Sequence, residues 1–212
     1  MIHELIEQGS PEWLALRCGK ATGSRVADAL KKNKDGKYAA SRIDYAYDLA
    51  LERLTGEPQG PDLSNVRWVQ DGKEWEADAR SLYEFLTDNE VRQIGFATHD
   101  TIELFGASPD GLVGEDGVLE IKCPKAKTHL GYLLAKEPPF DYLYQMDAEM
   151  ACTGRKWCDF VSFNPKSPPN LQYFCTRYYR DEARIKALEA GVIEFLSEVA
   201  AITESVRKAD KS

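Results

Sequence analysis

A short turn-forming segment between two apolar runs is the feature that most constrains how this chain folds. The segment is Gly-Glu-Asp-Gly at residues 114–117, and short apolar runs lie on either side of it. Glycine and aspartate between such runs are typical of a β-hairpin, whose strands must run antiparallel. Positions equidistant from residue 115 then lie opposite each other. We therefore expect strands at about 108–113 and 118–122, with Asp110 facing Glu120.

Three charged side chains converge on one spot if this hairpin forms. Like charges at Asp110 and Glu120 repel unless a cation lies between them. Residues two apart in a strand share a face, so Glu120 and Lys122 point to the same side. Leu119 and Ile121 then point into a core. The pattern predicts two oxygen ligands and one ammonium group at a common site.

Such a group suits hydrolysis of a phosphodiester. Mg²⁺ prefers about six oxygens, typically one or two carboxylates with waters and phosphate oxygens completing the shell. A bound metal ion activates water and polarises the phosphoryl group. Lys122 would orient the attacking water, take its proton, or offset charge on the phosphorus oxygens. The alternative is a surface hairpin that carries a Glu-Lys pair and has no catalytic role.

The motifs also resemble a known family. Pro109-Asp110 followed by Glu120-Ile121-Lys122 resembles the signature of the PD-(D/E)XK nucleases. The longer segments 108–111 and 119–124 resemble motifs of the phage lambda-type exonuclease, or viral recombinase and alkaline exonuclease, branch. Segments 16–24, 72–80 and 142–145 are similar, in the same order, to its arginine-serine, helical glutamate and late glutamine motifs. The resemblance extends over about residues 10–165.

The resemblance implies a role for each matching position. The implied metal ligands are Asp110, Glu120, the backbone carbonyl of Ile121 and, as an additional acid, Glu76, with Lys122 as the catalytic lysine. The implied pocket for the 5′-phosphate of the degraded strand consists of Arg17, Ser24, Ser108 and Gln145. Arginine offers phosphate a planar fork of donors, and hydroxyls and an amide add neutral ones. Mg²⁺ is the expected cofactor, with Mn²⁺ as a substitute.

Several of these residues also have ordinary structural explanations. Arg17 would complement the dipole at the end of its helix. Glu76 lies on a charged helix, and Gln145 could be a helix-surface residue. Two positions depart from the family pattern: Gly23 replaces a frequent alanine, and Asp147 replaces a frequent second glutamine. Asp147 either faces away from the site or joins the outer shell of the metal.

The resemblance implies a Mg²⁺-dependent deoxyribonuclease that degrades one strand of linear double-stranded DNA from 5′ to 3′ into mononucleotides. It leaves a 3′ overhang for phage-type homologous recombination. Implied partners are double-stranded DNA ends, two further copies in a homotrimeric ring, and a single-strand annealing protein. The alternatives are another PD-(D/E)XK enzyme that cuts internally as an endonuclease, a non-catalytic DNA-end-binding module and, more remotely, a metal-free sugar hydrolase.

Composition agrees with an intracellular enzyme of one domain. The chain has 212 residues, of which 43% are apolar, and no linker or repeat divides it. We expect a single exonuclease domain over residues 1–212. The five cysteines form no CxxC pair and suit a reducing cytoplasm. The family resemblance implies that this is the cytoplasm of a bacterial host, with the gene carried by a phage or prophage. No segment resembles a signal peptide or a spanning helix, so we expect no membrane partner.

The net charge of −8 argues against DNA binding unless the cations are clustered. Two lysine clusters occur: Lys31, Lys32, Lys34 and Lys37, and Lys122, Lys125 and Lys127. An acidic exterior with a basic interior channel would account for both observations. The first cluster could equally be a solvated loop.

Apolar periodicity predicts an α+β fold in which helices flank a mixed central β-sheet, and the family resemblance implies that its core is restriction-endonuclease-like. Helices are expected at about 11–17, 23–32, 42–55, 66–87, 140–152 and 181–208. Strands are expected at about 91–98, 101–106, 108–113, 118–122, 157–164 and 171–179. Thr22 is expected to cap the second helix, and Ser41 with Asp44 to form a capping box at the third. The apolar stripe of the last helix is interpreted as core packing.

Overall fold

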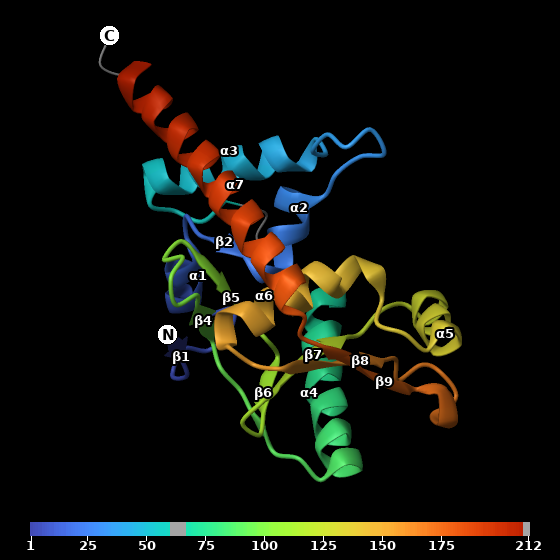
Figure 1. The fold of residues 1–212 in the computed structure, drawn as a ribbon. Coiled ribbons are helices and arrows are strands. Elements are labelled where there is room, and N and C mark those ends of the chain that lie inside the picture. The colour runs from blue at the N-terminus through green and yellow to red at the C-terminus, as the bar shows by residue number, and fades with distance from the viewer. Residues whose placement is uncertain (60–66, 210–212) are drawn as a thin grey trace.

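The computed structural model describes residues 1–59 and 67–209 (Figure 1). The predicted start of a helix at residue 66 therefore lies outside the described residues. The α+β class, with mixed sheets flanked by helices, is confirmed. None of the described helices is both long enough and apolar enough to cross a membrane.

The larger sheet has five strands in the order β3-β6-β7-β8-β9. These strands are Val91–Arg92, Gly111–Val113, Gly117–Lys122, Trp157–Phe163 and Tyr173–Tyr179. β7 and β8 run parallel, whereas the other pairs are antiparallel, so the sheet is mixed as predicted. β7 lies at the centre of the sheet, with a hydrogen-bonded neighbour strand on each side.

A second sheet has four strands in the order β1-β4-β5-β2. They are Ile2–His3, Phe96–Thr98, Phe105–Ala107 and Ala21–Thr22. The sequence did not predict β1 or β2. It also predicted one strand over 91–98, which instead divides between the two sheets at Gly95. A side chain on Gly95 would lie 2.1 Å from the carbonyl oxygen of Ile6, so only glycine fits where the chain passes between the sheets.

The predicted strand at 101–106 begins only at Phe105. The ring nitrogen Nδ1 of His99 accepts hydrogen bonds from the backbone N–H groups of Thr101 (3.3 Å) and Ile102 (3.1 Å). A side chain that accepts from nearby backbone donors stabilises a turn in place of a ladder. The first part of the predicted strand is therefore a turn.

The helices follow the predicted order with one addition. The α-helices are Pro11–Arg17 (α1), Val26–Leu30 (α2), Ser41–Thr55 (α3), Arg67–Thr87 (α4), Ala126–Ala135 (α5), Leu143–Thr153 (α6) and Glu182–Ala209 (α7). Short 3-10 turns are Gly23–Arg25, Phe140–Tyr142 and Pro169–Leu171. The sequence did not predict α5, whose spacing of apolar residues is weakly periodic.

Both predicted helix caps are wrong. Ser41 lies inside α3, and its hydroxyl donates to the carbonyl of Asp28 at 3.2 Å instead of capping the helix. Thr22 precedes a 3-10 turn and makes no side-chain cap hydrogen bond. Its backbone N–H donates to the hydroxyl of Tyr45 at 2.9 Å. At Ser41 a tertiary contact thus replaces the local one.

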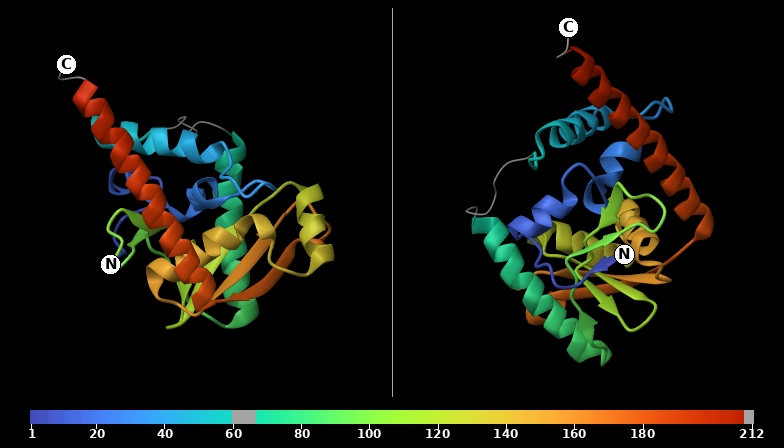
Figure 2. Two further views of the ribbon diagram at one scale, coloured as in Figure 1. Left: turned by 45° about the horizontal axis from the view of Figure 1, so that its top comes forward. Right: turned by 90° about the vertical axis from the view of Figure 1, so that its left-hand side faces the viewer.

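The apolar stripe of α7 is core, as interpreted. Ile185, Leu188, Val192, Phe195 and Val199 are buried on this helix. α7 crosses α3 and packs against α2 and α6 (Figures 1 and 2). The ring of Phe195 stacks on that of Tyr45 with a centroid distance of 5.1 Å. This contact joins α7 to α3 within one hydrophobic core.

The five-stranded sheet has α4 on one face and α6 on the other (Figure 2). Leu119 and Ile121 pack toward α4 with Tyr83. Val118 packs toward α6 with Met146 and Met150. Because side chains alternate along a strand, Glu120 and Lys122 share the face of Val118. The sequence of β7 thus places two charged groups beneath α6.

Candidate active site

The hairpin brings Asp110 and Glu120 together in the predicted register. Gly111 pairs with Leu119, and Val113 pairs with Gly117, so Asp110 is opposite Glu120. The backbone N–H of Asp110 donates to the carbonyl of Leu119 at 3.1 Å. The carboxylate of Asp110 accepts from the N–H of Ile121 at 2.6 Å. The predicted cross-strand relationship is confirmed, and Asp110 is anchored across the hairpin by its own side chain.

A buried arginine fixes the turn of this hairpin. The Nη1 of Arg155 donates to the carbonyls of Val113 (3.1 Å), Gly114 (2.9 Å) and Gly117 (2.7 Å). A side chain on Gly117 would collide with the ring of Trp157 at 2.0 Å. Buried carbonyls need donors, and here one guanidinium supplies them. The sequence reasoning missed Arg155, because nothing local connects it to a turn some forty residues earlier.

Glu120 is almost fully enclosed, with 1% of its surface exposed. Its Oε1 forms an ion pair with the Nζ of Lys122 and accepts a hydrogen bond of 2.7 Å from Nε2 of Gln145. Its Oε2 is buried and has no hydrogen-bond partner among the described residues. A buried carboxylate oxygen without a donor is unfavourable. This oxygen is therefore free to ligate a cation.

Lys122 is held in its charged form. Burial by itself would lower the pKa of its ammonium group, but the negative charges of Glu120 and Asp110 outweigh that effect and raise the pKa. The ammonium also lies 5.1 Å from the centre of the Tyr142 ring. The prediction that Glu120 and Lys122 point to one side of β7 is confirmed.

Glu149 on α6 is a further acid at this site that the sequence reasoning missed. Its Oε1 accepts a hydrogen bond of 2.9 Å from the same Nε2 of Gln145 that binds Glu120. Burial raises the pKa of the Glu149 carboxyl well above its usual value, and the charge of Glu120 raises it further. Residues four apart share a helix face. The spacing between Gln145 and Glu149 was the signal that could have identified this acid.

Asp110 and Glu76 complete the acidic group. Desolvation raises the pKa of Asp110 well above its usual value, and the charges of Glu120 and Glu76 add to this effect. The pKa of Glu76 is also raised, first by burial and against the opposing charge of Arg80. The carboxylate of Glu76 accepts from Arg80 one helical turn later at 2.6 Å. A bound cation would stabilise the charged forms of these carboxyls, because it would relieve their mutual repulsion.

The donor set fits a hard divalent cation that retains some of its water. The buried free Oε2 of Glu120 and the repulsion around Asp110 are the observations that support this. Within residues 1–59 and 67–209, no three His, Cys, Asp or Glu side chains lie close enough together to hold a metal ion by themselves. Mg²⁺ does not require three, since it commonly uses one or two carboxylates. Of the predicted ligands, Asp110 and Glu120 lie opposite each other across the hairpin, and the set of Asp110, Glu120, the Ile121 carbonyl and Glu76 stays a prediction.

Arg17 lies outside the acidic group, in a cluster with Ser108 and Ser24. Its Nη1 donates to the hydroxyl of Ser108 at 3.2 Å, and its Nη2 approaches that of Ser24 at 3.5 Å. The guanidinium carbon lies 4.0 Å above the ring of Trp13. Burial lowers the pKa of Arg17 to about 10, while Tyr45 and Glu52 oppose the change. Arg17 is thus charged at neutral pH and brought together with two of its predicted pocket partners.

Trp13 orients this group and was also missed. Its indole Nε1 donates to the hydroxyl of Ser108 at 2.9 Å and to the carbonyl of Gly95 at 3.0 Å. Trp13 and Arg17 are four residues apart on α1, so they share a helix face. That spacing, within a helix whose bounds were predicted at 11–17, was the available signal.

Gln145 takes no part in the hydrogen bonds of Arg17. Its amide nitrogen donates to Glu120 and Glu149, which places it beside the acidic group. The prediction for Asp147 is resolved, because this carboxylate accepts from Arg184 and from the hydroxyl of Tyr178, both at 3.3 Å. Asp147 therefore faces α7 and β9, away from the site.

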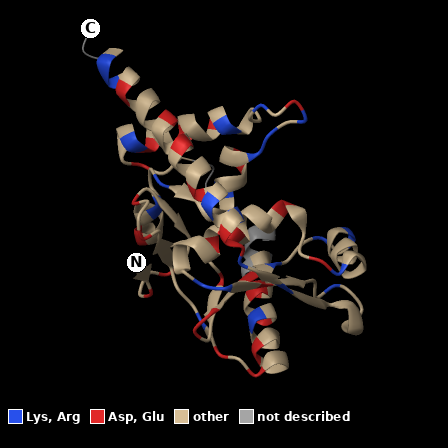
Figure 3. Ribbon diagram, in the orientation of Figure 1, with Lys and Arg blue, Asp and Glu red and all other residues tan. Residues whose placement is uncertain are grey.

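The first predicted lysine cluster lies on the loop between α2 and α3. Lys31, Lys32, Lys34 and Lys37 are exposed there, and Lys125 and Lys127 are exposed at the start of α5 (Figure 3). Acidic residues are spread along the helices and the hairpin turn (Figure 3). The basic channel stays a prediction.

Comparison with known proteins agrees with this arrangement. Residues 12–156 match the YqaJ-like viral recombinase domain family. The crystal structure of the alkaline exonuclease LHK-Exo from Laribacter hongkongensis is 45% identical, with a TM-score of 0.86 over 95% of this chain and 99% of that chain. Its complex with dAMP gives a TM-score of 0.87 at the same identity and coverage. A search of curated proteins finds no match.

A more distant structure shares the fold. The phage-related exonuclease from Haemophilus somnus 129PT is 16% identical, with a TM-score of 0.62 over 91% of this chain and 96% of that chain. The family match covers well over half of the chain and includes α1, α4, the hairpin and α6. This chain therefore belongs to the YqaJ-like viral recombinase domain family, as the resemblance of its motifs predicted.

Proposed function

We propose that this protein is a DNA exonuclease that degrades one strand of linear double-stranded DNA from its 5′ end and releases mononucleotides. One observation carries the proposal. The Arg17 group (Arg17, Ser24 and Ser108) and the acidic group (Glu76, Asp110, Glu120 and Glu149) adjoin each other, because Ser108 and Asp110 are separated in the chain by Pro109 alone. A phosphate bound at Arg17 would thus be held next to the acidic group. Family membership and the relation to an alkaline exonuclease support a nuclease that acts on DNA.

Mg²⁺ is the proposed cofactor, held by Asp110, Glu120, the Ile121 carbonyl and Glu76, and Mn²⁺ is expected to replace it. When bound, such a metal ion activates water and polarises the phosphoryl group. Lys122 projects its ammonium group from the same strand. It orients the attacking water and offsets negative charge on the phosphorus oxygens.

The Arg17 group supplies recognition of the DNA end. Its guanidinium presents a planar fork to phosphate oxygens, and the hydroxyls of Ser24 and Ser108 add neutral donors. Gln145 lies between the two groups in this proposal, because α6 packs on the 3-10 turn that carries Ser24 while its amide binds Glu120. The resulting site would prefer a 5′-phosphate to a 5′-hydroxyl.

The wider proposal follows the family resemblance. The chain acts as a single domain over residues 1–212, assembles as a homotrimeric ring around DNA, and leaves a 3′ overhang for an annealing protein in phage-type recombination. Packing of α7 against α2, α3 and α6 supports a single domain, since helices from both halves of the chain share one core.

Two DNA forms test the activity. Blunt linear duplex and covalently closed circular duplex are incubated with the wild type in Mg²⁺. We expect the linear form to be degraded and the closed circle to survive. Equal cutting of both would support the rival endonuclease instead. Loss of activity in EDTA is also expected, and activity that persists there would contradict a metal-dependent nuclease.

Two variants test the two halves of the site. Lys122→Ala is expected to bind duplex ends but not to cut them. Arg17→Ala is expected to cut but to lose its preference for a 5′-phosphate over a 5′-hydroxyl end. An Arg17→Ala enzyme with unchanged preference would overturn the pocket assignment. Unchanged cutting by Lys122→Ala would favour a different catalytic centre, and a wild type that binds ends without cutting would favour the end-binding module.

A further inference from the structure

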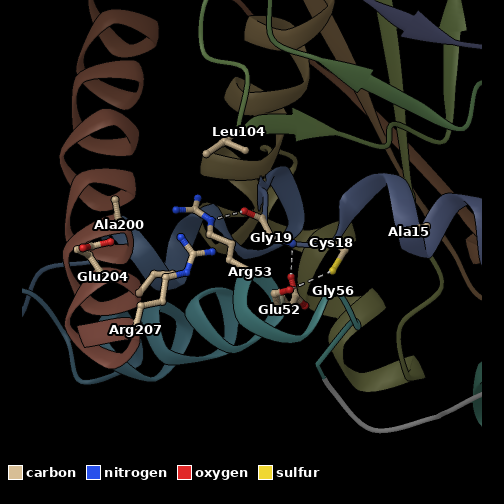
Figure 4. A pocket seen from close by; sticks show the side chains of 11 residues that line it. Ala15, Cys18, Gly19, Glu52, Arg53, Gly56, Leu104, Ala200, Glu204 and Arg207 are labelled. Atoms are coloured by element: carbon tan, nitrogen blue, oxygen red, sulfur yellow. Dashed lines mark hydrogen bonds between the residues drawn. The ribbon is translucent and has the colours of Figure 1, made fainter. Parts of the chain in front are cut away.

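A second pocket is lined by the turn that follows α1. Its volume is about 740 Å³, and its walls come from the end of α1, the end of α3 and the last turns of α7 (Figure 4). Neither the acidic group nor the three members of the Arg17 group line it. It is therefore distinct from the candidate active site, although it begins at Cys18 and Gly19, directly after Arg17.

Arg53 on α3 contributes an incompletely paired cation to this pocket. Its Nε donates to the carbonyl of Gly19 at 2.9 Å. Its Nη2 is buried and has no hydrogen-bond partner among the residues that the structure describes. Burial lowers the pKa of this guanidinium, and the charge of Glu52 only partly opposes that change. A buried donor without an acceptor is unfavourable, so a ligand that supplies an acceptor here would be stabilised.

Arg207 on α7 lies opposite. Figure 4 shows its guanidinium extending across the pocket toward that of Arg53. Arg207 is exposed, and it forms no ion pair with a residue in the described part of the chain. Two cations that converge in a partly enclosed space repel each other unless an anion lies between them.

The carboxylates of the pocket contact groups other than the two arginines. Glu52 accepts from the N–H of Gly19 at 2.6 Å and from that of Gln59 at 2.9 Å. Glu204 pairs with Lys208 at 3.6 Å. Neither carboxylate is hydrogen-bonded to Arg53 or Arg207 in the described residues. The buried Nη2 of Arg53 therefore has no acceptor among the described residues, and the exposed guanidinium of Arg207 is open to a ligand.

We propose that this pocket binds a phosphate group between Arg53 and Arg207. Two guanidinium groups offer the planar forks of donors that suit phosphate oxygens. The volume exceeds that of bare phosphate and is in the range of small-molecule sites. The phosphate comes either from free phosphate or a mononucleotide, or from a DNA backbone. A mononucleotide as the reaction product rests on the proposed function.

Occupancy of the pocket acts on the neighbouring site through Gly19. Arg53 holds the carbonyl of Gly19, and Glu52 holds its N–H. Gly19 follows Arg17 by two residues and has a φ of +73°, which favours glycine. A ligand that repositions Arg53 would therefore act on the turn that directly follows Arg17.

The test is calorimetric titration without metal, in an Arg17→Ala background, so that the proposed 5′-phosphate pocket does not contribute. The titrants are inorganic phosphate, dAMP and a 5′-phosphorylated duplex. To this background Arg207→Gln, Arg53→Gln or Lys186→Gln is added. Lys186 is an exposed cation at the other end of the same helix and does not line the pocket, so it serves as the matched control.

We expect Arg207→Gln and Arg53→Gln to weaken binding by at least about tenfold, which is the effect of losing a charge-assisted contact. Lys186→Gln should leave binding unchanged. Weaker binding of phosphate and dAMP identifies a free ligand. If only duplex binding weakens, and the slope of log affinity against log salt concentration falls by about one, the ligand is the DNA backbone.

Two results would overturn the proposal. One is that none of the three titrants binds the Arg17→Ala protein. The other is that binding is the same in the background and with Arg207→Gln, whose exposed side chain can be replaced without disturbing the core. Arg207→Gln decides the question if Arg53→Gln does not fold. Either result leaves the proposed exonuclease untouched, because end preference and strand degradation are measured separately.

Discussion

The side-chain amide of Gln145 donates a hydrogen bond of 2.7 Å to the carboxylate of Glu120. The same nitrogen lies 2.9 Å from an oxygen of Glu149. One residue of α6 thus joins the central strand β7 to a second buried acid. This contact assigns Gln145 a position beside the acidic group, whereas its family motif implies a role in phosphate binding.

Gln145→Met separates these two roles. Methionine has a similar length but cannot donate to Glu120, so the carboxylate loses its neutral donor. We expect the Mg²⁺ concentration for half-maximal cutting to rise by about three- to tenfold, since one hydrogen bond contributes roughly 1 kcal/mol. The preference for a 5′-phosphate end should persist. Loss of that preference at an unchanged Mg²⁺ requirement would restore Gln145 to the phosphate pocket.

Trp13→Phe tests the support of Arg17. The phenyl ring keeps the apolar contact under Arg17 but cannot donate to Ser108. We expect the ratio of cutting rates on 5′-phosphate and 5′-hydroxyl ends to fall by about three- to tenfold, again the effect of roughly one hydrogen bond. Leu14→Ala, an exposed change on the same helix, is the control and should keep the wild-type ratio. Equal ratios in both variants would show that Trp13 does not position Ser108.

Arg155→Met tests the arginine that holds the hairpin turn. The substitution leaves three carbonyls near the turn without their donor. We expect the free energy of unfolding in denaturant to fall by about 2–4 kcal/mol, as for other buried polar groups that lose their partners. Lys156→Gln is the matched control, because its ion pair with Asp116 is exposed and contributes roughly 0–1 kcal/mol. Similar losses in the two variants would contradict this role for Arg155.

The acidic group predicts a pH dependence of stability in the absence of metal. Burial raises the pKa of Glu149 above its value in the unfolded chain, with Glu120 adding to the effect. The stability contributed by the protonated form is therefore complete below the unfolded pKa and is lost as pH rises through the folded pKa. Glu149→Gln keeps the neutral form at every pH. Between about pH 5 and about pH 8, we expect the Tm of the wild type to fall more steeply than that of Glu149→Gln.

The control for this experiment is Glu90→Gln, an exposed acid away from the site. Its Tm should follow the wild type across the same pH range. The raised pKa of Asp110 remains in all these proteins, so some decline is expected even in Glu149→Gln. If the Tm of the wild type and that of Glu149→Gln fell equally with pH, deprotonation of Glu149 would not destabilise the fold, and this prediction would be wrong.

Local patterns accounted for most of the helices and for the hairpin. The bounds of α1 and the extent of α7 follow from apolar spacing that each segment carries by itself. The pairing of Asp110 with Glu120 follows from the turn, because register in a hairpin is set by its loop. Such features need no knowledge of distant residues.

Features that depend on distant partners were not predictable in this way. The chain passes between two sheets at Gly95 because the backbone of Ile6 lies against it. Ser41 does not cap α3 because the carbonyl of Asp28 accepts from its hydroxyl. In each case the local preference is weak, and a contact across the fold outweighs it.

The sequence by itself determined the family, the α+β class and the identity of Asp110, Glu120 and Lys122 as one group, since these depend on short-range spacing. Only the tertiary structure decided that Glu149 joins them, that Asp147 turns toward Arg184, and that Trp13 supports Arg17 through Ser108. The physical reason is burial. The cost of enclosing a charge, and hence its partner and its pKa, is set by residues that meet only when the chain has folded.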